Sequence, residues 1–279
     1  MGNLYYFILL QCLLAPSVIG FNFFGFHGFH SNPDIFCIAE HCSSQSAACV
    51  EDRDCRANME CSAKCGFSNF NCLYECINTY ENQVYDKFMK CMVEDYHCLK
   101  LVSPDPSFRC KPPQAQVKNF SLSALNGKWY IVYGLNPEYD CFNCQISTYA
   151  PTPNSKNLTL TEKYDVTMLN GSTRHRVTVQ QVQQRDIFNG GLLDFTNVMM
   201  GLMMYEKWQI IDFAESGNYA VIYYCGHMTS DWYYEGGLVY SRTPTISSED
   251  LVSIQTAIST KLGHKLDQYC HLRTEDCVS

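Results

Sequence analysis

The stretch GKWYIVYGLNPEYDCFNCQ, residues 127–145, is the most informative part of the chain. It opens with a run of aromatic and β-branched residues, Trp129 to Val132, that is typical of a half-buried strand. The run breaks at Gly134 and at the Asn136-Pro137 pair, which predicts a turn. The stretch ends in a carboxylate, two cysteines and an amide: Asp140, Cys141, Cys144 and Gln145.

Further strand-like stretches follow at intervals, and most of them alternate polar and apolar residues between Gly, Asn, Asp or Ser. This pattern predicts an up-and-down antiparallel barrel, and a barrel of about eight strands is just wide enough for one elongated ligand. Residues 186–204, rich in Gly, Met and Leu, fit either a strand or a loop over the barrel mouth. The strand-like stretches cover residues 128–133, 158–167, 174–181, 207–213, 219–224 and 236–242.

A helix is predicted near the C-terminus. Ser247 and the acidic residues that follow it form an N-cap signal. An apolar stripe at helical spacing comes next. Its members are Leu251, Ile254, Ile258 and Leu262.

Seventeen cysteines indicate a disulfide framework made in an oxidising compartment. Eleven of them lie within residues 37–110, and Cys61/Cys65 and Cys72/Cys76 have helical spacing. That spacing puts both sulfurs of a pair on one helix face, ready to bridge to a neighbouring helix. Because eleven is odd, one cysteine of this segment is either free or paired with the barrel. The disulfide cysteines expected here are Cys37, Cys42, Cys49, Cys55, Cys61, Cys65, Cys72, Cys76, Cys91 and Cys98.

Two other uses of cysteine compete with this interpretation. Zinc is one, but this segment lacks the C-x₂-C knuckles of structural zinc sites. A redox pair at Cys141 and Cys144 is the other, and structural pairing is favoured because nothing suggests a thioredoxin-like βαβ context. His27 and His30 fit a solvated tail better than a metal site, so we expect no metal.

The N-terminal segment and the glycosylation sequons indicate secretion. Residues 4–14 form an apolar run that is too short to span a bilayer, and small residues follow it up to Gly20. This predicts a cleavable signal peptide, with a membrane anchor as the alternative. Acceptor sequons at Asn119, Asn157 and Asn170 fit a glycoprotein. The formal charge of −8, without a basic run, argues against a nucleic-acid partner.

Several of these motifs resemble one family. Gly127-x-Trp129 resembles the lipocalin signature, and residues 127–145 as a whole resemble the first barrel strand of the violaxanthin de-epoxidase family. The cysteine spacing from Cys55 to Cys98, and the segment ENQVYDKFMKC ending at Cys91, resemble the Cys-rich domain that precedes that barrel. The resemblance covers residues 37–277.

The resemblance implies a mainly β chain: a lipocalin-like eight-stranded antiparallel barrel with a C-terminal helix, preceded by a small disulfide-rich α-helical domain. It also implies that Cys277 pairs with Cys144, and that Arg242 stacks on Trp129 by cation–π contact at the closed end. The expected segments are a signal peptide over 1–20, a Gly/Phe/His linker over 21–34, the Cys-rich helical domain over 35–112, the barrel over 113–246, and the helix with its tethered tail over 247–279.

The implied function is reductive opening of an epoxide on a carotenoid-type substrate, with ascorbate as reductant. Glu206 stands where the family has its proposed Asp acid, and Trp208 shares its strand face. A carboxyl inside an apolar barrel has a raised pKa, so it can keep the proton that an epoxide oxygen needs. The resemblance makes Glu206, Tyr224 and Gln145 catalytic, and Trp208, Tyr240 and Asp140 substrate contacts.

The chain also departs from the family. Asn143 and Ser147 replace an Asp and a His thought to sense acidity, so that pH switch is lost or altered. Cys225 replaces an Arg, and the leader lacks the Arg- and Ser-rich composition of a plant plastid transit peptide. The alternatives to the enzyme are therefore a secreted carrier of a hydrophobic ligand without catalysis and a disulfide-rich structural protein with a filled barrel.

We expect the protein in the secreted or endomembrane-lumen fraction, with the lumen of a secondary plastid, reached through a bipartite leader, as the alternative. The expected partner is a lipophilic small molecule. Two further interactions stay open: contact with a membrane surface and formation of a homodimer.

Overall fold

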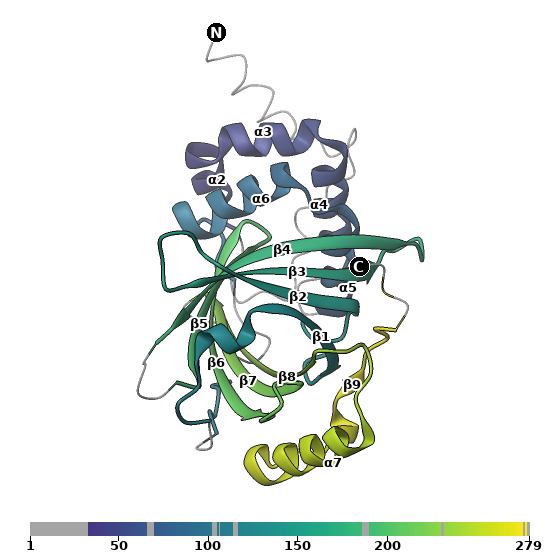
Figure 1. Ribbon diagram of the computed structural model, residues 1–279. Helices are drawn as coiled ribbons and strands as arrows, with labels where there is room; N and C mark the ends of the chain where they lie inside the picture. Colours follow the sequence, from purple (N-terminus) through teal and green to yellow (C-terminus); the bar gives the residue numbers. More distant parts are fainter. Residues whose placement is uncertain are drawn as a thin grey trace.

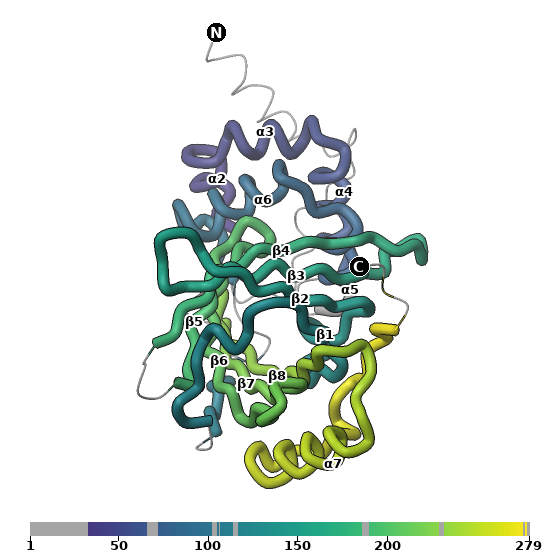
Figure 2. Tube along the Cα trace, in the orientation of Figure 1, coloured from purple at the N-terminus to yellow at the C-terminus, as the bar shows by residue number. Residues whose placement is uncertain are grey.

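The structure is a computed structural model that describes residues 33–65, 70–101, 105, 107–113, 117–185, 190–229, 232–275 and 277. The expected signal peptide, Cys12, His27 and His30 lie outside these residues. Short helices form one layer and a β-barrel forms the other, with a C-terminal helix on the far side of the barrel (Figure 1). The chain trace runs once through the helical layer, then around the barrel, and ends beside it (Figure 2).

The helical layer is built from short, capped helices. Asp34 caps the first by accepting a hydrogen bond from the amide of Cys37, and Asn82 caps the last by accepting from Val84 and Tyr85. The buried face of the last helix carries Tyr85, Phe88 and Met89. The helices are α2 (Ile35–His41), α3 (Ser43–Glu51), α4 (Arg53–Cys65), α5 (Phe70–Tyr80) and α6 (Gln83–Lys90), which continues as a π-turn over Cys91–Asp95.

Disulfides hold these helices together. The cysteine pairs with helical spacing bridge two neighbouring helices, α4 and α5, as expected, and the bridges are Cys61–Cys76 and Cys65–Cys72. Because the described cysteines are all in disulfides, none offers a thiolate to zinc. The remaining bridges of this layer are Cys37–Cys98, Cys42–Cys91 and Cys49–Cys55.

Three further disulfides involve the barrel. The odd cysteine of the N-terminal segment is Cys110, and its partner is Cys225 on the barrel wall. Cys141 and Cys144 do not pair with each other, because Cys141 bonds to Cys270 and Cys144 to Cys277. The second of these is the pairing that the family resemblance implied.

The barrel is an eight-stranded meander that closes when β1 pairs with both β2 and β8. A short ninth strand, β9 (Cys270–His271), adds to the end of β1. This confirms the predicted fold class. The barrel strands are β1 (Gly127–Gly134), β2 (Asn143–Pro151), β3 (Leu158–Thr167), β4 (Thr173–Gln184), β5 (Leu192–Met199), β6 (Leu202–Phe213), β7 (Tyr219–Thr229) and β8 (Trp232–Ser241).

Two strands differ from the sequence-based expectation. β2 was not among the predicted strands, because the polar residues Gln145 and Ser147 share the buried face of this strand with Tyr149. The segment 186–204, left open between a strand and a loop, contains β5 and a tight turn into β6. Met200 and Gly201 both have positive φ in that turn, 56° and 73°.

The closed end of the barrel has the expected Trp–Arg pair. The guanidinium of Arg242 lies 3.6 Å above the ring of Trp129, and it also donates to the carbonyls of Ala124, Asn126 and Lys128. The first two carbonyls belong to, or directly follow, the 3₁₀ turn Leu122–Leu125 that plugs this end, and the third belongs to β1. Arg242 therefore joins the plug to the barrel.

The predicted C-terminal helix is α7 (Ser248–Ala257), which continues as a π-turn over Ile258–Leu262. The hydroxyl of Ser247 accepts from the amide of Asp250, which confirms the N-cap. Ile254 and Ile258 are fully buried in a cluster on the outer barrel wall.

The helical layer is attached to the barrel by two arginines of β4. Arg174 donates to the carbonyls of Asn78, Thr79 and Glu81, at the C-terminal end of α5. Arg176 donates to the carbonyl of Ile77 and forms an ion pair of 2.6 Å with Glu81. Cations are favourable at a helix C-terminus, so these contacts fix α5 over the edge of the barrel. Among the described residues, no helix is both long and apolar enough to cross a membrane.

Candidate functional site

A polar cavity of about 50 Å³ lies inside the barrel at the end near the helical layer. That volume admits a few water molecules. Three carboxyl groups line it together with aromatic and amide side chains, although carboxylates are rarely placed inside a barrel. They are Asp140 from the loop after β1, Glu162 from β3 and Glu206 from β6.

Glu206 points into the cavity and has two donors. The indole nitrogen of Trp208 donates to its Oε2 at 2.6 Å, and the hydroxyl of Tyr234 donates to its Oε1 at 2.8 Å. Burial raises the pKa of Glu206, and the two hydrogen bonds partly oppose that rise. The indole ring stacks on Phe195 at 3.9 Å, which fixes the orientation of the donor. A held carboxyl with a raised pKa can deliver a proton to a bound substrate.

Asp140 and Tyr224 form a second buried pair. The Tyr224 hydroxyl donates to Oδ1 of Asp140 at 2.7 Å, and the amides of Asn136 and Gly237 donate to Oδ2. Burial raises the pKa of Asp140 to about 8 although these hydrogen bonds lower it. A Cβ on Gly236 would lie 2.3 Å from the Tyr224 hydroxyl, so only glycine leaves room for the pair. Asp140 is 2% exposed, so it acts first as the anchor of its loop.

Glu162 is a cavity carboxyl that the sequence analysis missed. The Gln145 side-chain amide, expected to orient the substrate, donates instead to Oε1 of Glu162 at 3.1 Å. Burial raises the pKa of Glu162 to about 7. The signal was present in the sequence, because Glu162 alternates with buried Leu158 and Leu160 on one strand face.

Tyr240 does not line the cavity. Its ring stacks on Trp129 at 5.7 Å, deeper in the barrel, and its hydroxyl donates to the hydroxyl of Ser147 at 3.1 Å. The hydroxyl of Tyr149 lies 3.0 Å from it. Ser147 stands where the family that the chain resembles has a His. In this chain the Ser147 hydroxyl connects the Tyr240 hydroxyl to the carboxyl of Glu162.

Aromatic rings stand at the mouth of the cavity. Tyr139 stacks on Tyr234 at 4.8 Å, and Phe142 stacks on Tyr164 at 4.9 Å. Tyr74 of α5 meets the ring of Tyr139 edge-on at 5.8 Å, so the helical layer contributes to this rim.

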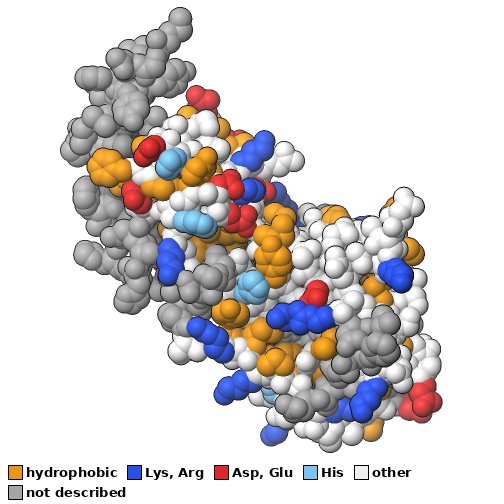
Figure 3. Space-filling model, turned by 90° about the vertical axis from the view of Figure 1, so that its left-hand side faces the viewer, with side chains coloured by type: hydrophobic (Ala, Val, Ile, Leu, Met, Phe, Trp, Pro, Cys, Tyr) orange, Lys and Arg blue, Asp and Glu red, His pale blue; other side chains and the backbone are white. Residues whose placement is uncertain are grey.

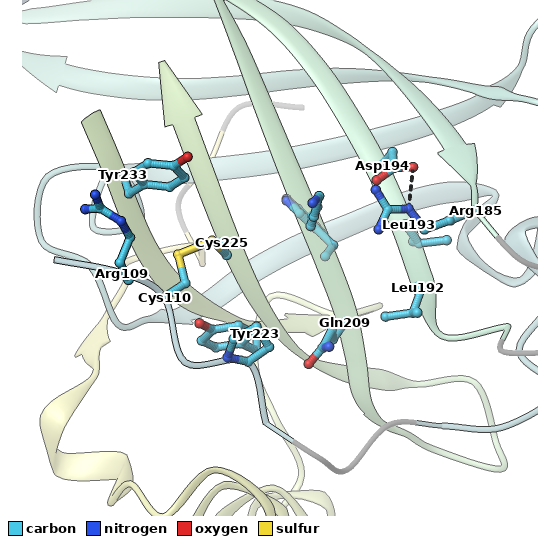
Figure 4. A pocket seen from close by; sticks show the side chains of 13 residues that line it. Arg109, Cys110, Arg185, Leu192, Leu193, Asp194, Gln209, Tyr223, Cys225 and Tyr233 are labelled. Carbon is cyan, nitrogen blue, oxygen red and sulfur yellow. Dashed lines mark hydrogen bonds and ion pairs between the residues drawn. A yellow bond between two sulfur atoms is a disulfide. The ribbon is translucent and has the colours of Figure 1, made fainter. Parts of the chain in front are cut away.

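A second, larger cavity of about 360 Å³ lies on the outer wall of the barrel. The strap around Cys110 crosses the strands there and is bonded to them by the Cys110–Cys225 disulfide (Figure 4). Arg185 bonds to Asp194 on one side of the cavity, and Arg109 lies over the ring of Tyr233 on the other. On the face of the molecule seen in Figure 3, basic side chains are dispersed among hydrophobic ones.

Two of the three sequons lie in loops of the barrel, and the third lies in the segment that leads into β1. Asn119 and Asn170 are exposed, and Asn157 is half-buried before β3. Asn170 uses its side-chain oxygen to accept from the amide and hydroxyl of Ser172 within a turn. Accessible turn positions suit a glycan, and glycosylation of these residues stays a prediction.

The comparisons with known proteins agree with this architecture. The sequence profile of the VDE lipocalin domain matches residues 34–274. The chain belongs to the violaxanthin de-epoxidase family. It is 28% identical over 226 residues to violaxanthin de-epoxidase, chloroplastic, of Arabidopsis thaliana, covering 79% of this chain and 48% of the relative. The enzyme of the same name from Spinacia oleracea is 26% identical over 245 residues, covering 86% and 50%. The chain thus spans about half the length of the curated relatives it matches.

Solved lipocalin structures are more distant. Insecticyanin from the tobacco hornworm Manduca sexta has a TM-score of 0.46 and 14% identity, covering 61% of this chain and 90% of that one. Lobster apocrustacyanin A1 has a TM-score of 0.40 and 12% identity, covering 58% and 92%. We draw no functional argument from likenesses at this level.

Proposed function

We propose that this protein is a violaxanthin de-epoxidase-like oxidoreductase that opens an epoxide on a carotenoid-type lipid inside the barrel, with ascorbate as reductant. Glu206 is the general acid in this proposal, and Trp208 and Tyr234 hold its carboxyl. Asp140 and Tyr224 anchor the loop that forms the cavity mouth. The observation that carries the proposal is the half-buried, hydrogen-bonded carboxyl of Glu206, which faces the cavity together with two further carboxyls.

The free-energy cost of placing carboxyl groups inside the barrel favours an enzyme over a passive carrier. Burying a carboxyl destabilises a fold unless it is protonated or well paired, so a lipid carrier gains nothing from three of them. An acid catalyst, in contrast, needs a carboxyl whose pKa is raised toward the working pH. Burial has that effect on Glu206.

The chemistry balances with ascorbate. Protonation of the epoxide oxygen weakens both of its C–O bonds. Two electrons from ascorbate and a second proton then convert the ring into a C=C bond and one water, while ascorbate becomes dehydroascorbate. Glu206 supplies the first proton, and the residues around the cavity shield the opened ring from water. Of the two enolic protons of ascorbate, one is the second proton of the water and the other reprotonates Glu206. The rings at the mouth must separate to admit the end ring of the lipid.

The site of action that we propose is the secreted or luminal compartment. The eight disulfides among the described residues support this, because such bonds persist where thiols are kept oxidised. The exposed sequons at Asn119 and Asn170 fit the same compartment.

The test uses oxidised full-length protein with violaxanthin in lipid micelles and ascorbate, and it follows the visible absorption of the pigment. We expect turnover by the native protein and a loss of at least about 100-fold in Glu206→Gln. Glu215→Gln, an exposed carboxyl in the turn after β6, is the matched control and keeps full activity. Bound pigment without turnover would instead make the protein a carrier of a hydrophobic ligand.

A further inference from the structure

Glu162 is held by neutral partners from the two neighbouring strands. Its Oε1 accepts from the Gln145 amide at 3.1 Å and from the Ser147 hydroxyl at 3.4 Å, both on β2. Its Oε2 accepts from the amide of Gln180 on β4 at 3.5 Å. Gln145 and Gln180 are 3% and 7% exposed. The two glutamines therefore form a buried polar cluster around the half-buried carboxyl of Glu162.

This arrangement leaves acceptors unused. Because both glutamines turn their N–H groups toward Glu162, the carbonyl oxygens of Gln145 and Gln180 are buried without a hydrogen-bond partner. The hydroxyl of Thr178 is unpartnered in the same way. All three residues line the inner cavity. Folded proteins seldom leave such atoms unpaired, and each one costs free energy until a donor reaches it.

We propose that Gln145, Gln180 and Thr178, gathered around Glu162, form a hydroxyl-binding pole, which accepts hydrogen bonds from the O–H groups of a neutral ligand held beside Glu206. Neutral O–H groups fit better than an ammonium group, because burial disfavours charge on Glu162 and its partners are uncharged. This proposal rests on the proposed function for the identity of the ligand beside Glu206. It adds that this part of the cavity selects ligands that carry hydroxyl groups.

Two sources can supply such hydroxyls. One is a hydroxyl on the ring that carries the epoxide, which would dock at the pole while the epoxide oxygen faces Glu206. The other is the reductant, a small polyhydroxyl lactone. In both cases a ligand without the hydroxyl leaves the carbonyl acceptors unpaired, and sites of this kind discriminate strongly against such ligands.

The test compares Gln180→Met with Gln181→Met in the full-length oxidised protein. Gln181 is the next residue of β4, is exposed on the outer face, and serves as the matched control. One arm compares an epoxy-carotenoid that carries the ring hydroxyl with one that lacks it, and the other arm measures the KM for ascorbate. If the ring hydroxyl docks at the pole, Gln180→Met reduces the preference for the hydroxylated lipid roughly five- to tenfold. If the reductant docks there, the KM for ascorbate rises by a similar factor.

A folded Gln180→Met protein that matches the control in both arms would overturn the pole. Thr178→Val is the second variant, in case Gln180→Met does not fold. Failure of the proposed function is recognised separately, because both arms can be repeated as equilibrium binding without turnover, by tryptophan quenching for the lipids and dialysis for ascorbate. Hydroxyl-dependent binding that Gln180→Met weakens supports the pole even in a protein that turns nothing over.

Discussion

The Tyr224 hydroxyl lies 2.7 Å from Oδ1 of Asp140 and ties the seventh strand to the loop that follows the first. Both residues are buried, and the backbone amides of Asn136 and Gly237 complete the coordination of the carboxyl. This pair holds the loop that carries Tyr139 and Phe142 over the cavity. The position of the mouth therefore depends on a hydrogen bond between two residues that are 84 positions apart in the sequence.

Removal of that hydroxyl should destabilise the fold. Tyr224→Phe leaves a buried carboxyl oxygen without its donor, so the free energy of unfolding should fall by about 1–3 kcal/mol. Chemical denaturation measures the change. Tyr205→Phe, which removes a hydroxyl from a side chain of β6 that is 47% exposed, is the control and should change little. Equal stability of the two variants would contradict the anchoring role.

Tyr234 should tune the acid. Its hydrogen bond lowers the pKa of Glu206, so Tyr234→Phe should raise that pKa further. The alkaline limb of the pH profile of kcat/KM then moves to higher pH, while kcat falls roughly tenfold because the carboxyl is held less firmly. Tyr233→Phe alters the neighbouring residue of the same strand and should leave the limb in place. An unmoved limb in Tyr234→Phe would remove Tyr234 from the site.

Stability should decrease as the pH rises. Burial raises the pKa of Glu162 to about 7 and that of Asp140 to about 8. Between the ordinary carboxyl pKa of about 4 and these values, the folded chain holds protons that the unfolded chain has released, so the unfolding free energy falls with pH. Denaturant titrations at about pH 5 and about pH 8 should show this fall, and a smaller one in Glu162→Gln. A Glu162→Gln protein with the native pH slope would show that Glu162 is ionised throughout.

The closed end should depend on arginine itself. Arg242→Lys keeps the charge but loses the planar group that stacks on Trp129 and donates to three carbonyls. We expect a loss of about 1–3 kcal/mol in unfolding free energy. Arg53→Lys is the control, since that side chain is 88% exposed. If Arg242→Lys were as stable as the control, the plug would be held by other contacts.

Local patterns in the sequence predicted much of this structure. The aromatic run at Trp129 and the alternation of β6 identified barrel strands, and period two correctly put Glu206 and Trp208 on one face. Helical cysteine spacing predicted that bridges join neighbouring helices, as they do between α4 and α5, but it did not predict which cysteines pair. These features depend on neighbours within a few residues, which is why the sequence reveals them.

Features that depend on distant partners were not predictable in this way. Glu162 was overlooked because a strand carboxylate is usually solvated, and its burial depends on Gln145 and Gln180 from the adjoining strands. The partner of Cys110 is 115 residues away, and spacing does not encode a bond of that span. Tyr240 was expected at the cavity wall, but its ring lies against Trp129 at a depth that strand alternation does not specify.

The central claim is that the barrel reduces an epoxide, and the most direct measurement is the stoichiometry of ascorbate consumption. Oxidised full-length protein is mixed with violaxanthin in lipid micelles and a limiting amount of ascorbate. Dehydroascorbate and lost epoxide are then quantified together. We predict one dehydroascorbate formed for each epoxide group lost, with both processes abolished in Glu206→Gln. Violaxanthin bound by the protein, with its epoxides intact and no ascorbate oxidised, would contradict the account.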